Sequence, residues 1–300
     1  MWLIYALLCM LLWSGSELFC KIGCVEKEEH FSSWKMGMAV GLVMGLHAMY
    51  GIFVKGIPIS WGIILQYAPV SALYIGSMLI GYLGLKYIEL SISTPICNSS
   101  GSVVVLIYLL LGEKPGLGAL IGFAFAALGI LSLSFVTYSE DDEARIARQQ
   151  VGSRKYVKSP LAILLPILYC IIDAAGTFWD SWILSRGLIP EDSANTAYEL
   201  SFALFGLICF IIFVSQKKIT FNKKLDLYKL GGAITETGGQ FFYVYALAAN
   251  PVASTPVISA YCAVSLIWAH LFLKEKLSFA HYVSLTIIFT GIILLGIYGE

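Results

Sequence analysis

Residues 92–114 read ISTPICNSSGSVVVLIYLLLGEK, an apolar run that opens on Ser-Thr-Pro and closes on Glu-Lys. Residues 254–276, STPVISAYCAVSLIWAHLFLKEK, show the same features in the same order. In both copies a glycine, Gly129 or Gly291, follows 16 residues after the glutamate. One such feature can recur by chance, but the ordered set of proline, acid–lysine pair and glycine indicates an internal repeat. The repeat divides the chain at about residue 150.

The composition is that of a protein embedded in lipid. Hydrophobic residues make up 58% of the 300 and charged residues 13%, about half the charged fraction of a soluble domain. The mean hydropathy is +0.81 and the net charge is zero, so no basic surface suggests a nucleic-acid partner. The seven cysteines are scattered through mostly apolar runs, which favours small buried side chains over disulfides or a metal site. We therefore predict an integral membrane protein without a metal or other cofactor.

Ten apolar runs are long enough to cross a bilayer. A hydrocarbon core of about 30 Å takes about 20 apolar residues in a helix. By that measure the sequence predicts transmembrane helices at roughly 2–22, 32–54, 63–86, 92–112, 116–137, 160–185, 195–215, 227–249, 252–273 and 278–298.

The connections between these spans are short except for a charged linker at 138–159. The linker separates a first five-helix unit at 1–137 from a second at 160–300. Because five is odd, two homologous units joined in series enter the membrane from opposite faces. The predicted fold class is an all-α integral membrane protein of ten transmembrane helices arranged as a 5+5 inverted-topology repeat, an architecture typical of secondary transporters.

Lysine and arginine are unevenly divided between the two sides of the membrane. The loops after spans 1, 3, 5, 7 and 9, with their flanks, hold 16 of the 19 basic residues, and the other side holds Lys55, Lys114 and Arg186. The positive-inside bias predicts that the first set of loops faces the cytoplasm of a cell membrane and that both termini lie outside.

Carboxyl groups inside the spans are the first candidates for function, because an ionisable side chain costs at least about 2.5 kcal/mol to place there. Glu17 lies within span 1, Asp173 in span 6 and Glu236 in span 8, where Gln240 and Tyr243 continue the same helix face. Burial favours the neutral form of a carboxyl group, which can then exchange protons near neutral pH, and the ionised form attracts a cation. We interpret these residues as substrate-binding or coupling groups.

Other polar residues of the spans have plainer explanations. Asp180 and Glu199 are close enough to span ends to be hydrated, and His47 and His270 are expected to be isolated packing residues. Asn98 follows the proline of span 4, where it either lines a polar site or bonds to backbone groups that the proline frees.

Each Ser-Thr-Pro is expected to begin its helix. A Ser or Thr cap followed by proline is typical of a helix start. Such a start directs the positive end of the helix dipole outward, and it either faces a polar cavity or belongs to a tight turn between helices.

The charged and aromatic residues of the spans narrow the substrate class. No lysine or arginine is predicted deep in a span, which argues against phosphorylated sugars and nucleotide-sugars, since these need buried cationic groups. Aromatic residues are frequent on the spans, among them Trp13 and Tyr261. Acidic and aromatic side chains together form ammonium sites, although aromatics are also ordinary packing residues in membranes.

Glycines spaced by four residues predict close helix contacts. Gly37, Gly41 and Gly45 form such a row on span 2, and Gly118 with Gly122 forms one on span 5. Small residues at this spacing let helix backbones approach in lipid, for static packing or for sliding during transport.

Trp13-Ser14-Gly15, the two Ser-Thr-Pro to Glu-Lys blocks, Gly129 and Gly291 together resemble the drug/metabolite transporter superfamily, in its ten-helix EamA-type branch. The resemblance covers the chain except the long linker. It implies a central cavity lined by spans 1–4 and 6–9, with spans 5 and 10 peripheral and available for a homodimer. It also implies cytoplasmic termini, the reverse of the charge count. The lining residues that it implies are Trp13, Glu17, Asn98, Asp173, Glu236, Gln240 and Tyr261.

The leading hypothesis is a secondary-active transporter of a small cationic or zwitterionic metabolite, amine or amino-acid-like, that works by alternating access and is proton-coupled through its acids. The alternative is a transporter of neutral metabolites or drugs in which the acids are structural. No enzyme is expected, because no nucleophile, base or metal ligands share a suitable spacing. A non-transporting receptor or scaffold is the remote alternative. The expected partners are a small-molecule substrate and the lipid bilayer.

Overall fold

The computed structural model describes residues 1–23, 32–84, 96–139, 160–215, 222–273 and 277–299. Within these ranges the chain is helical and has no strand. Ser93-Thr94-Pro95, Glu275-Lys276 and all but the first two residues of the 138–159 linker lie outside the described residues.

The helices of the two halves correspond to the predicted spans. The first half forms α1 (Trp2–Gly23), α2 (Ser32–Phe53), α3 (Trp61–Gly84), α5 (Ser100–Leu110) and α6 (Leu117–Ser139). The second half forms α8 (Pro160–Ser185), α9 (Glu191–Ser215), α10 (Lys223–Ala249), α11 (Pro251–Ser259), α12 (Tyr261–Leu273) and α13 (Phe279–Tyr298). Because α11 and α12 follow each other within one span, the described helices fill all ten predicted spans.

Most of these spans are long and apolar enough to cross a membrane on their own. Seven helical spans among the described residues meet that condition, α5 is a shorter apolar helix, and α6 contains the apolar stretch Leu117–Leu133. The remaining span, α10, is the least hydrophobic, because its first turns carry Lys223, Lys224, Asp226 and Lys229. The protein is therefore a multi-pass, all-α membrane protein.

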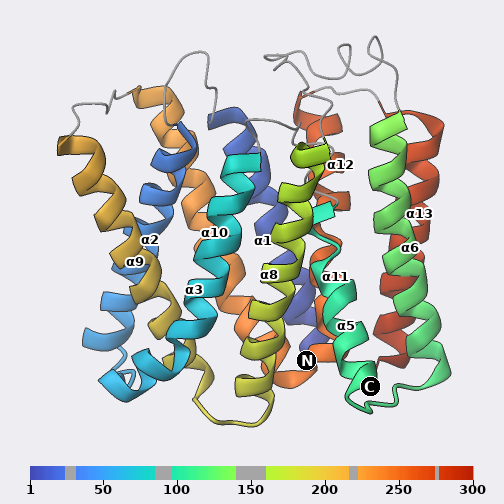
Figure 1. Cartoon of the computed structure of the whole chain (residues 1–300), viewed down its shortest axis with the longest axis horizontal. Coiled ribbons are helices and arrows are strands. Elements are labelled where there is room, and N and C mark those ends of the chain that lie inside the picture. The colour runs from blue at the N-terminus through green and yellow to red at the C-terminus, as the bar shows by residue number, and fades with distance from the viewer. Residues whose placement is uncertain (24–31, 85–95, 140–159, 216–221, 274–276, 300) are drawn as a thin grey trace.

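The helices stand side by side with both chain ends at the same end of the bundle (Figure 1). We call this end the termini side, and we call the opposite end, where α6 finishes and α8 begins, the linker side. Helices α2 and α9 stand at one end of the row, and α6 and α13 stand at the other (Figure 1). The peripheral position of α6 and α13 is the one that the family resemblance implies.

The packing of the helices has the pairwise order of an inverted repeat. Helix α1 packs along α10, and α3 packs along α8. The counterpart of each span lies five spans along the chain, so α1 corresponds to α8 and α3 corresponds to α10. Exchanging counterparts turns the first pair into the second. Helices α2 and α9 pack on each other, as do α6 and α13, so each of these pairs is exchanged with itself. The fold is a 5+5 inverted-topology repeat, and the unit boundaries at 137 and 160 stay a prediction.

Glycines make the closest crossings, as their spacing predicts. A Cβ added to Gly41 of α2 would lie 2.5 Å from the carbonyl oxygen of Phe202 and 2.9 Å from the Cα of Gly206 on α9. A Cβ on Gly122 of α6 would lie 2.9 Å from the backbone nitrogen of Leu295 on α13. Such distances are too short for any larger residue, so these glycines hold the helix backbones in contact. Sliding at these surfaces stays a prediction.

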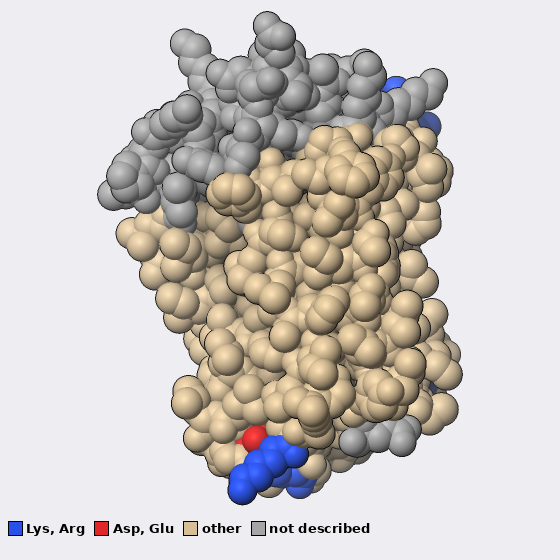
Figure 2. Space-filling model, turned by 90° about the vertical axis from the view of Figure 1, so that its right-hand side faces the viewer, with Lys and Arg blue, Asp and Glu red and all other residues tan. Residues whose placement is uncertain are grey.

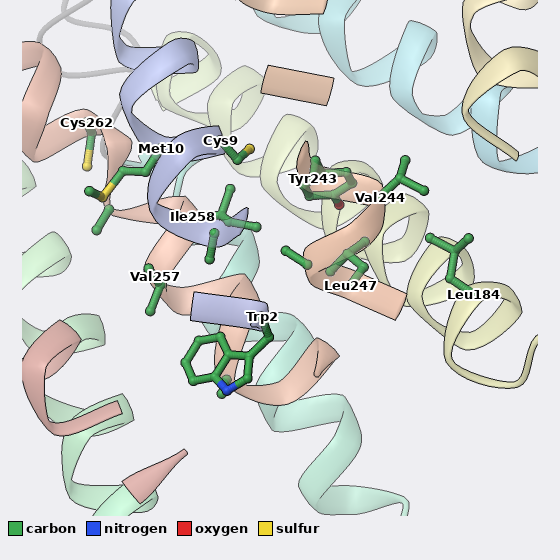
Figure 3. Close-up of a cluster of buried hydrophobic side chains, with 14 of the residues drawn as sticks. Trp2, Cys9, Met10, Leu184, Tyr243, Val244, Leu247, Val257, Ile258 and Cys262 are labelled. Atoms are coloured by element: carbon green, nitrogen blue, oxygen red, sulfur yellow. The ribbon is translucent and has the colours of Figure 1, made fainter. Parts of the chain in front are cut away.

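Apolar side chains fill the centre of the bundle. Trp2, Cys9 and Met10 of α1 lie in one buried cluster with Val257 and Ile258 of α11 (Figure 3). The described cysteines are free thiols, and all except the half-buried Cys20 are buried. They are packing residues, as the sequence predicts.

The outer surface of α6 and α13 is an apolar face. On this side of the molecule Lys, Arg, Asp and Glu side chains are visible only near the ends (Figure 2). Phe135, Leu128, Ile293 and Ile297 are among its exposed large side chains. A face of this kind suits contact with lipid tails.

Replacing Gly41 with alanine tests the α2–α9 crossing. The added methyl group would overlap the α9 backbone, so we expect the protein to lose about 1–3 kcal/mol of stability, the usual cost of overpacking. Thermal unfolding of the purified protein in detergent measures the loss. The matched control is Gly76→Ala on α3, where nothing lies within 4 Å of the added atom. Equal melting temperatures for the two variants would contradict the crossing.

Candidate functional site

One cavity of about 260 Å³ gathers all eight residues that the sequence singles out as site residues. Helices α1, α8 and α10, the turn before α5 and the start of α12 supply them. They are Trp13, Glu17, Asn98, Asp173, Glu236, Gln240, Tyr243 and Tyr261. The sequence distributes them over five spans, and helix packing brings their side chains around a common space. Their roles in binding or coupling stay a prediction.

Three carboxyl groups line the cavity. Glu17 of α1 and Glu236 of α10 are close enough to repel each other electrostatically, and Ser16 lies next to the Glu236 carboxyl. Asp173 of α8 is reached by the hydroxyl of Ser77 on α3, at 3.5 Å. No lysine or arginine is among the described residues that line the cavity. This wall therefore attracts positive charge and offers no cationic group to hold a phosphate.

An aromatic wall stands beside the two glutamates. The ring of Trp13 lies 5.0 Å from that of Tyr243 and 5.9 Å from that of Tyr261, centre to centre. The indole N–H donates to the backbone carbonyl oxygen of Glu236 at 3.3 Å. Gly239 permits this approach, because a Cβ there would overlap the Trp13 ring. Sequence inspection missed the role of Gly239, although its place one turn after Glu236 was a signal.

Spans 4 and 9 are both interrupted at the cavity. In span 4 the residues Asn98 and Ser99 form a turn, and α5 begins at Ser100. In span 9 Ala260 separates α11 from α12. Irregular backbone inside a membrane is tolerated only where it is buried in protein or lines a cavity. The breaks occur near equivalent positions of the two repeats, as in the discontinuous helices of many transporters.

The expected helix start at the second Ser-Thr-Pro is wrong. Helix α11 begins at Pro251, where the side chain of Asn250 accepts a hydrogen bond from the backbone N–H of Ala253, and Pro256 lies inside the helix. Asn250 provides a better cap than Thr255 because its side chain reaches the free N–H groups of the first turn. Pro256 lies inside α11 instead, four residues before the break at Ala260.

Several polar atoms of the cavity wall are unused by the protein. The side-chain nitrogens of Asn98 and Gln240 and the hydroxyl of Thr255 are buried and have no hydrogen-bond partner in the described part of the chain. Leaving buried polar groups unpaired is costly. Asn98 therefore does not use its amide nitrogen to cap freed backbone, and these three atoms keep unused hydrogen-bonding capacity within the cavity wall.

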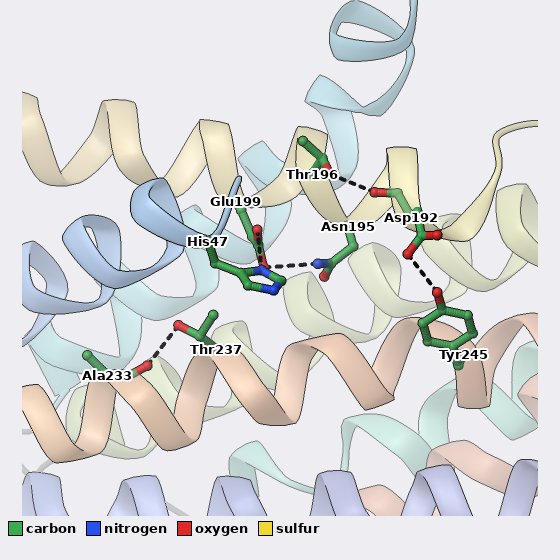
Figure 4. Close-up of polar contacts among 8 residues, drawn as sticks. All are labelled: His47, Asp192, Asn195, Thr196, Glu199, Ala233, Thr237 and Tyr245. Atoms are coloured by element: carbon green, nitrogen blue, oxygen red, sulfur yellow. Dashed lines mark hydrogen bonds and ion pairs between the residues drawn. The ribbon is translucent and has the colours of Figure 1, made fainter. Parts of the chain in front are cut away.

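Glu199 and His47 depart from expectation. Glu199 is fully buried, not hydrated, and its carboxylate lies 2.7 Å from Nδ1 of His47 across the α2–α9 contact (Figure 4). Asn195 donates to the same carboxylate at 2.9 Å. His47 is thus a partner of Glu199 and not an isolated packing residue. The prediction used only the distance of Glu199 from the end of its span. That distance does not show which face of α9 another helix covers.

Two lysines near the linker side are buried as well. Lys35 of α2 and Lys229 of α10 both pair with Asp226, at 2.7 and 3.5 Å. Both lie near the ends of their helices, in agreement with the prediction that no lysine is deep in a span, and other helices cover them. Neither lines the cavity, so the argument against phosphorylated substrates stands.

A layer of hydroxyl-bearing and acidic side chains lies on the termini side of the cavity. The hydroxyls of Tyr74 and Tyr243 lie 2.5 Å apart, and each lies 3.1 Å from the hydroxyl of Thr177. One tyrosine donates to the other, and the second donates to Thr177. Beyond them the hydroxyl of Tyr67 donates to Asp180 at 2.6 Å. We call these five residues the seal. Asp180 is fully buried, so the expectation that it is hydrated is wrong.

The comparisons with known proteins agree with this architecture. The model of the EamA-like transporter family matches residues 1–135 and 161–297. A crystal structure of a protein with 15% sequence identity aligns over 98% of this chain and 96% of its own, with a TM-score of 0.69. A likeness at this identity shows the fold alone. No match was found among curated proteins.

A methyl group at Gly239 should displace Trp13 and disorder the aromatic wall. We expect Gly239→Ala to shift the tryptophan fluorescence and to lower the melting temperature, because the indole has no room to stay in place. Gly238→Ala is the matched control, since a Cβ there meets only the tip of Leu12, at 3.3 Å. An unchanged spectrum for Gly239→Ala would show that the indole lies elsewhere.

Proposed function

The chain belongs to the EamA-like transporter family, and we propose that it is a secondary-active transporter of a small cationic or zwitterionic metabolite, amine or amino-acid-like. As a member of this family it is a membrane transporter of the drug/metabolite superfamily. The observation that carries the proposed substrate class is the cavity, whose described lining has three carboxyl groups, an aromatic wall and no lysine or arginine. An ammonium group is the solute group that satisfies both the charge and the ring faces.

Alternating access is the mechanism that the geometry supports best. The cavity lies in the middle and the linker-side half of the bundle, since its lining includes Cys20 near the end of α1 and Met36 near the start of α2. Toward the termini side the seal blocks it. An inverted repeat can exchange the two arrangements by rocking one unit against the other. The structure then represents the conformation that is closed to the termini side.

We propose a cell membrane as the location, with the linker side in the cytoplasm by the positive-inside bias. A homodimer through the apolar face of α6 and α13 is a further proposal. That pair stands apart from the cavity, so a partner there would leave the transport path free.

Choline and 3,3-dimethylbutan-1-ol distinguish the cationic class from neutral metabolites. The two molecules have nearly the same shape, and only choline is charged. We expect choline alone to stabilise the purified protein, by about 2.7 kcal/mol at a hundredfold excess over its Kd. Equal stabilisation by the neutral alcohol would favour a transporter of neutral metabolites in which the acids are structural.

Counterflow in liposomes tests transport itself. We expect vesicles preloaded with choline to accumulate labelled choline when the protein is present. Binding of choline without any flux would contradict transport and leave a receptor or scaffold.

Glu236→Gln tests proton coupling at the cavity. The substitution keeps the shape of the side chain and removes its titration, so we expect uptake of choline into proteoliposomes to depend less steeply on pH. A single coupled proton changes an equilibrium by at most about tenfold per pH unit. Glu113→Gln on the exposed termini-side loop is the control and should behave as the wild type. Unchanged pH dependence in Glu236→Gln would remove this residue from the coupling mechanism.

A further inference from the structure

The carboxyl group of Asp180 is not part of the cavity lining. It lies on α8, seven residues after Asp173 and thus on the same helix face, and it is fully buried in the seal. One carboxyl oxygen accepts the hydrogen bond from Tyr67 of α3. The other oxygen has no partner among the described residues, and neither does the hydroxyl of Ser71, one turn along α3 from Tyr67. Two unused polar atoms therefore lie in the contact between α3 and α8.

Among the described residues, none is paired with Asp180 as a counter-ion. The titratable groups that face it from the packed helices are Tyr67 and Tyr74 of α3, Tyr108 of α5, Tyr198 of α9 and Tyr243 of α10. Asp173 lies on the same helix, and Arg186 follows the last residue of α8, with its guanidinium 4.5 Å from the centre of the Trp182 ring. A carboxylate buried without a positive partner is strongly disfavoured. In this conformation the group is therefore the neutral acid.

A row of hydroxyl groups leads from Asp180 to the cavity. Tyr74 lies next to the Asp180 carboxyl, and its hydroxyl is hydrogen-bonded to those of Tyr243 and Thr177. All three of these hydroxyl-bearing side chains line the cavity. A hydroxyl group both donates and accepts, so such a row provides a path for a proton between the carboxyl group and the water of the cavity.

We propose that Asp180 is a proton-binding site that controls the seal on the termini side. The protonated acid lets α3 and α8 pack together. When the proton leaves to water, the carboxylate needs solvation, and this requirement separates the two helices and opens the seal. The proposal rests on the proposed function, because it adds a second proton-binding site, below the substrate cavity, to the cavity acids that couple transport.

Hydrogen–deuterium exchange of the protein in lipid nanodiscs, without any solute, measures the seal directly. Exchange is followed in peptides covering 61–72 of α3 and 177–185 of α8 between pH 5 and pH 9, corrected for the intrinsic pH dependence of amide exchange. We expect protection to fall by up to about tenfold per pH unit once the acid ionises, as for an opening equilibrium linked to one proton. Asp180→Asn, which cannot ionise, should stay protected at every pH.

Two further variants complete the experiment. Asp192→Asn makes the same chemical change at an exposed position on the termini side, and it should show the wild-type pH dependence. Tyr67→Phe removes the donor to Asp180 but keeps the carboxyl group, so it should retain the pH dependence with less protection throughout. Because Tyr67→Phe keeps the acid, it tests the proposal even if Asp180→Asn does not fold.

Three results would overturn the inference: protection in the wild type that ignores pH, pH dependence that persists in Asp180→Asn, or protection at fixed pH that follows the sodium concentration. The last would indicate a metal cation in place of the proton. The outcome is separate from that of the transport assays. A protein that moves no choline but opens its seal with rising pH would contradict the proposed substrate and support the role of Asp180. A protein that transports choline while its seal ignores pH would support the proposed function and contradict the role of Asp180.

Discussion

Inside a membrane every backbone N–H and C=O must be hydrogen-bonded by the protein, and this constraint decides where the fold is allowed to be irregular. The described chain obeys it with near-continuous helices and breaks its regularity at Asn98–Ser99 and at Ala260. Both interruptions adjoin the cavity, and tighter turns keep the backbone there hydrogen-bonded, with the N–H of Ser99 on Ile96 and that of Ala260 on Val257. The two breaks lie near equivalent positions of the repeats, which explains why they come as a pair.

The same constraint applies to charge. Glu17, Asp173 and Glu236 are spread over three helices, yet each points into the same space because a carboxyl group facing lipid is too costly. The size of the side chains also differs between this space and the ends of the row. The glycine contacts of α2 with α9 and of α6 with α13 bring backbones together at the two ends of the row, and the larger aromatic side chains gather around the cavity. Packing and electrostatics thus place the site at the centre of the bundle.

Sequence reasoning found the parts of the site that follow from energetic cost. The spans could be predicted because they are long apolar runs, and the three acids because a carboxyl group in such a run is costly. The repeat could be predicted because its proline, acid–lysine pair and glycine recur in the same order. Asp180, Glu199 and His47 were misjudged because distance from a span end does not show whether another helix covers that face. Gly239 and the break at Ala260 depend on contacts between spans far apart in the chain, Trp13 with α10 and α5 with α11. No local pattern encodes such contacts.

An inverted repeat with identical halves would make the two ends of the bundle equivalent, and the two sequences have diverged enough to prevent this. On the linker side Lys35, Lys229 and Asp226 form an ion-paired group between α2 and α10. Opening on this side would bring opposite charges into water together, which removes their desolvation cost and leaves no unpaired buried charge. On the termini side, Asp180 lies in a dry contact without a positive partner, and water can enter only when the helices separate. Opening toward the linker side therefore changes the charge environment little, whereas opening toward the termini side changes the solvation of a buried acid. The balance between the two conformations should accordingly depend on a proton at one end of the molecule, although the fold itself is nearly symmetric.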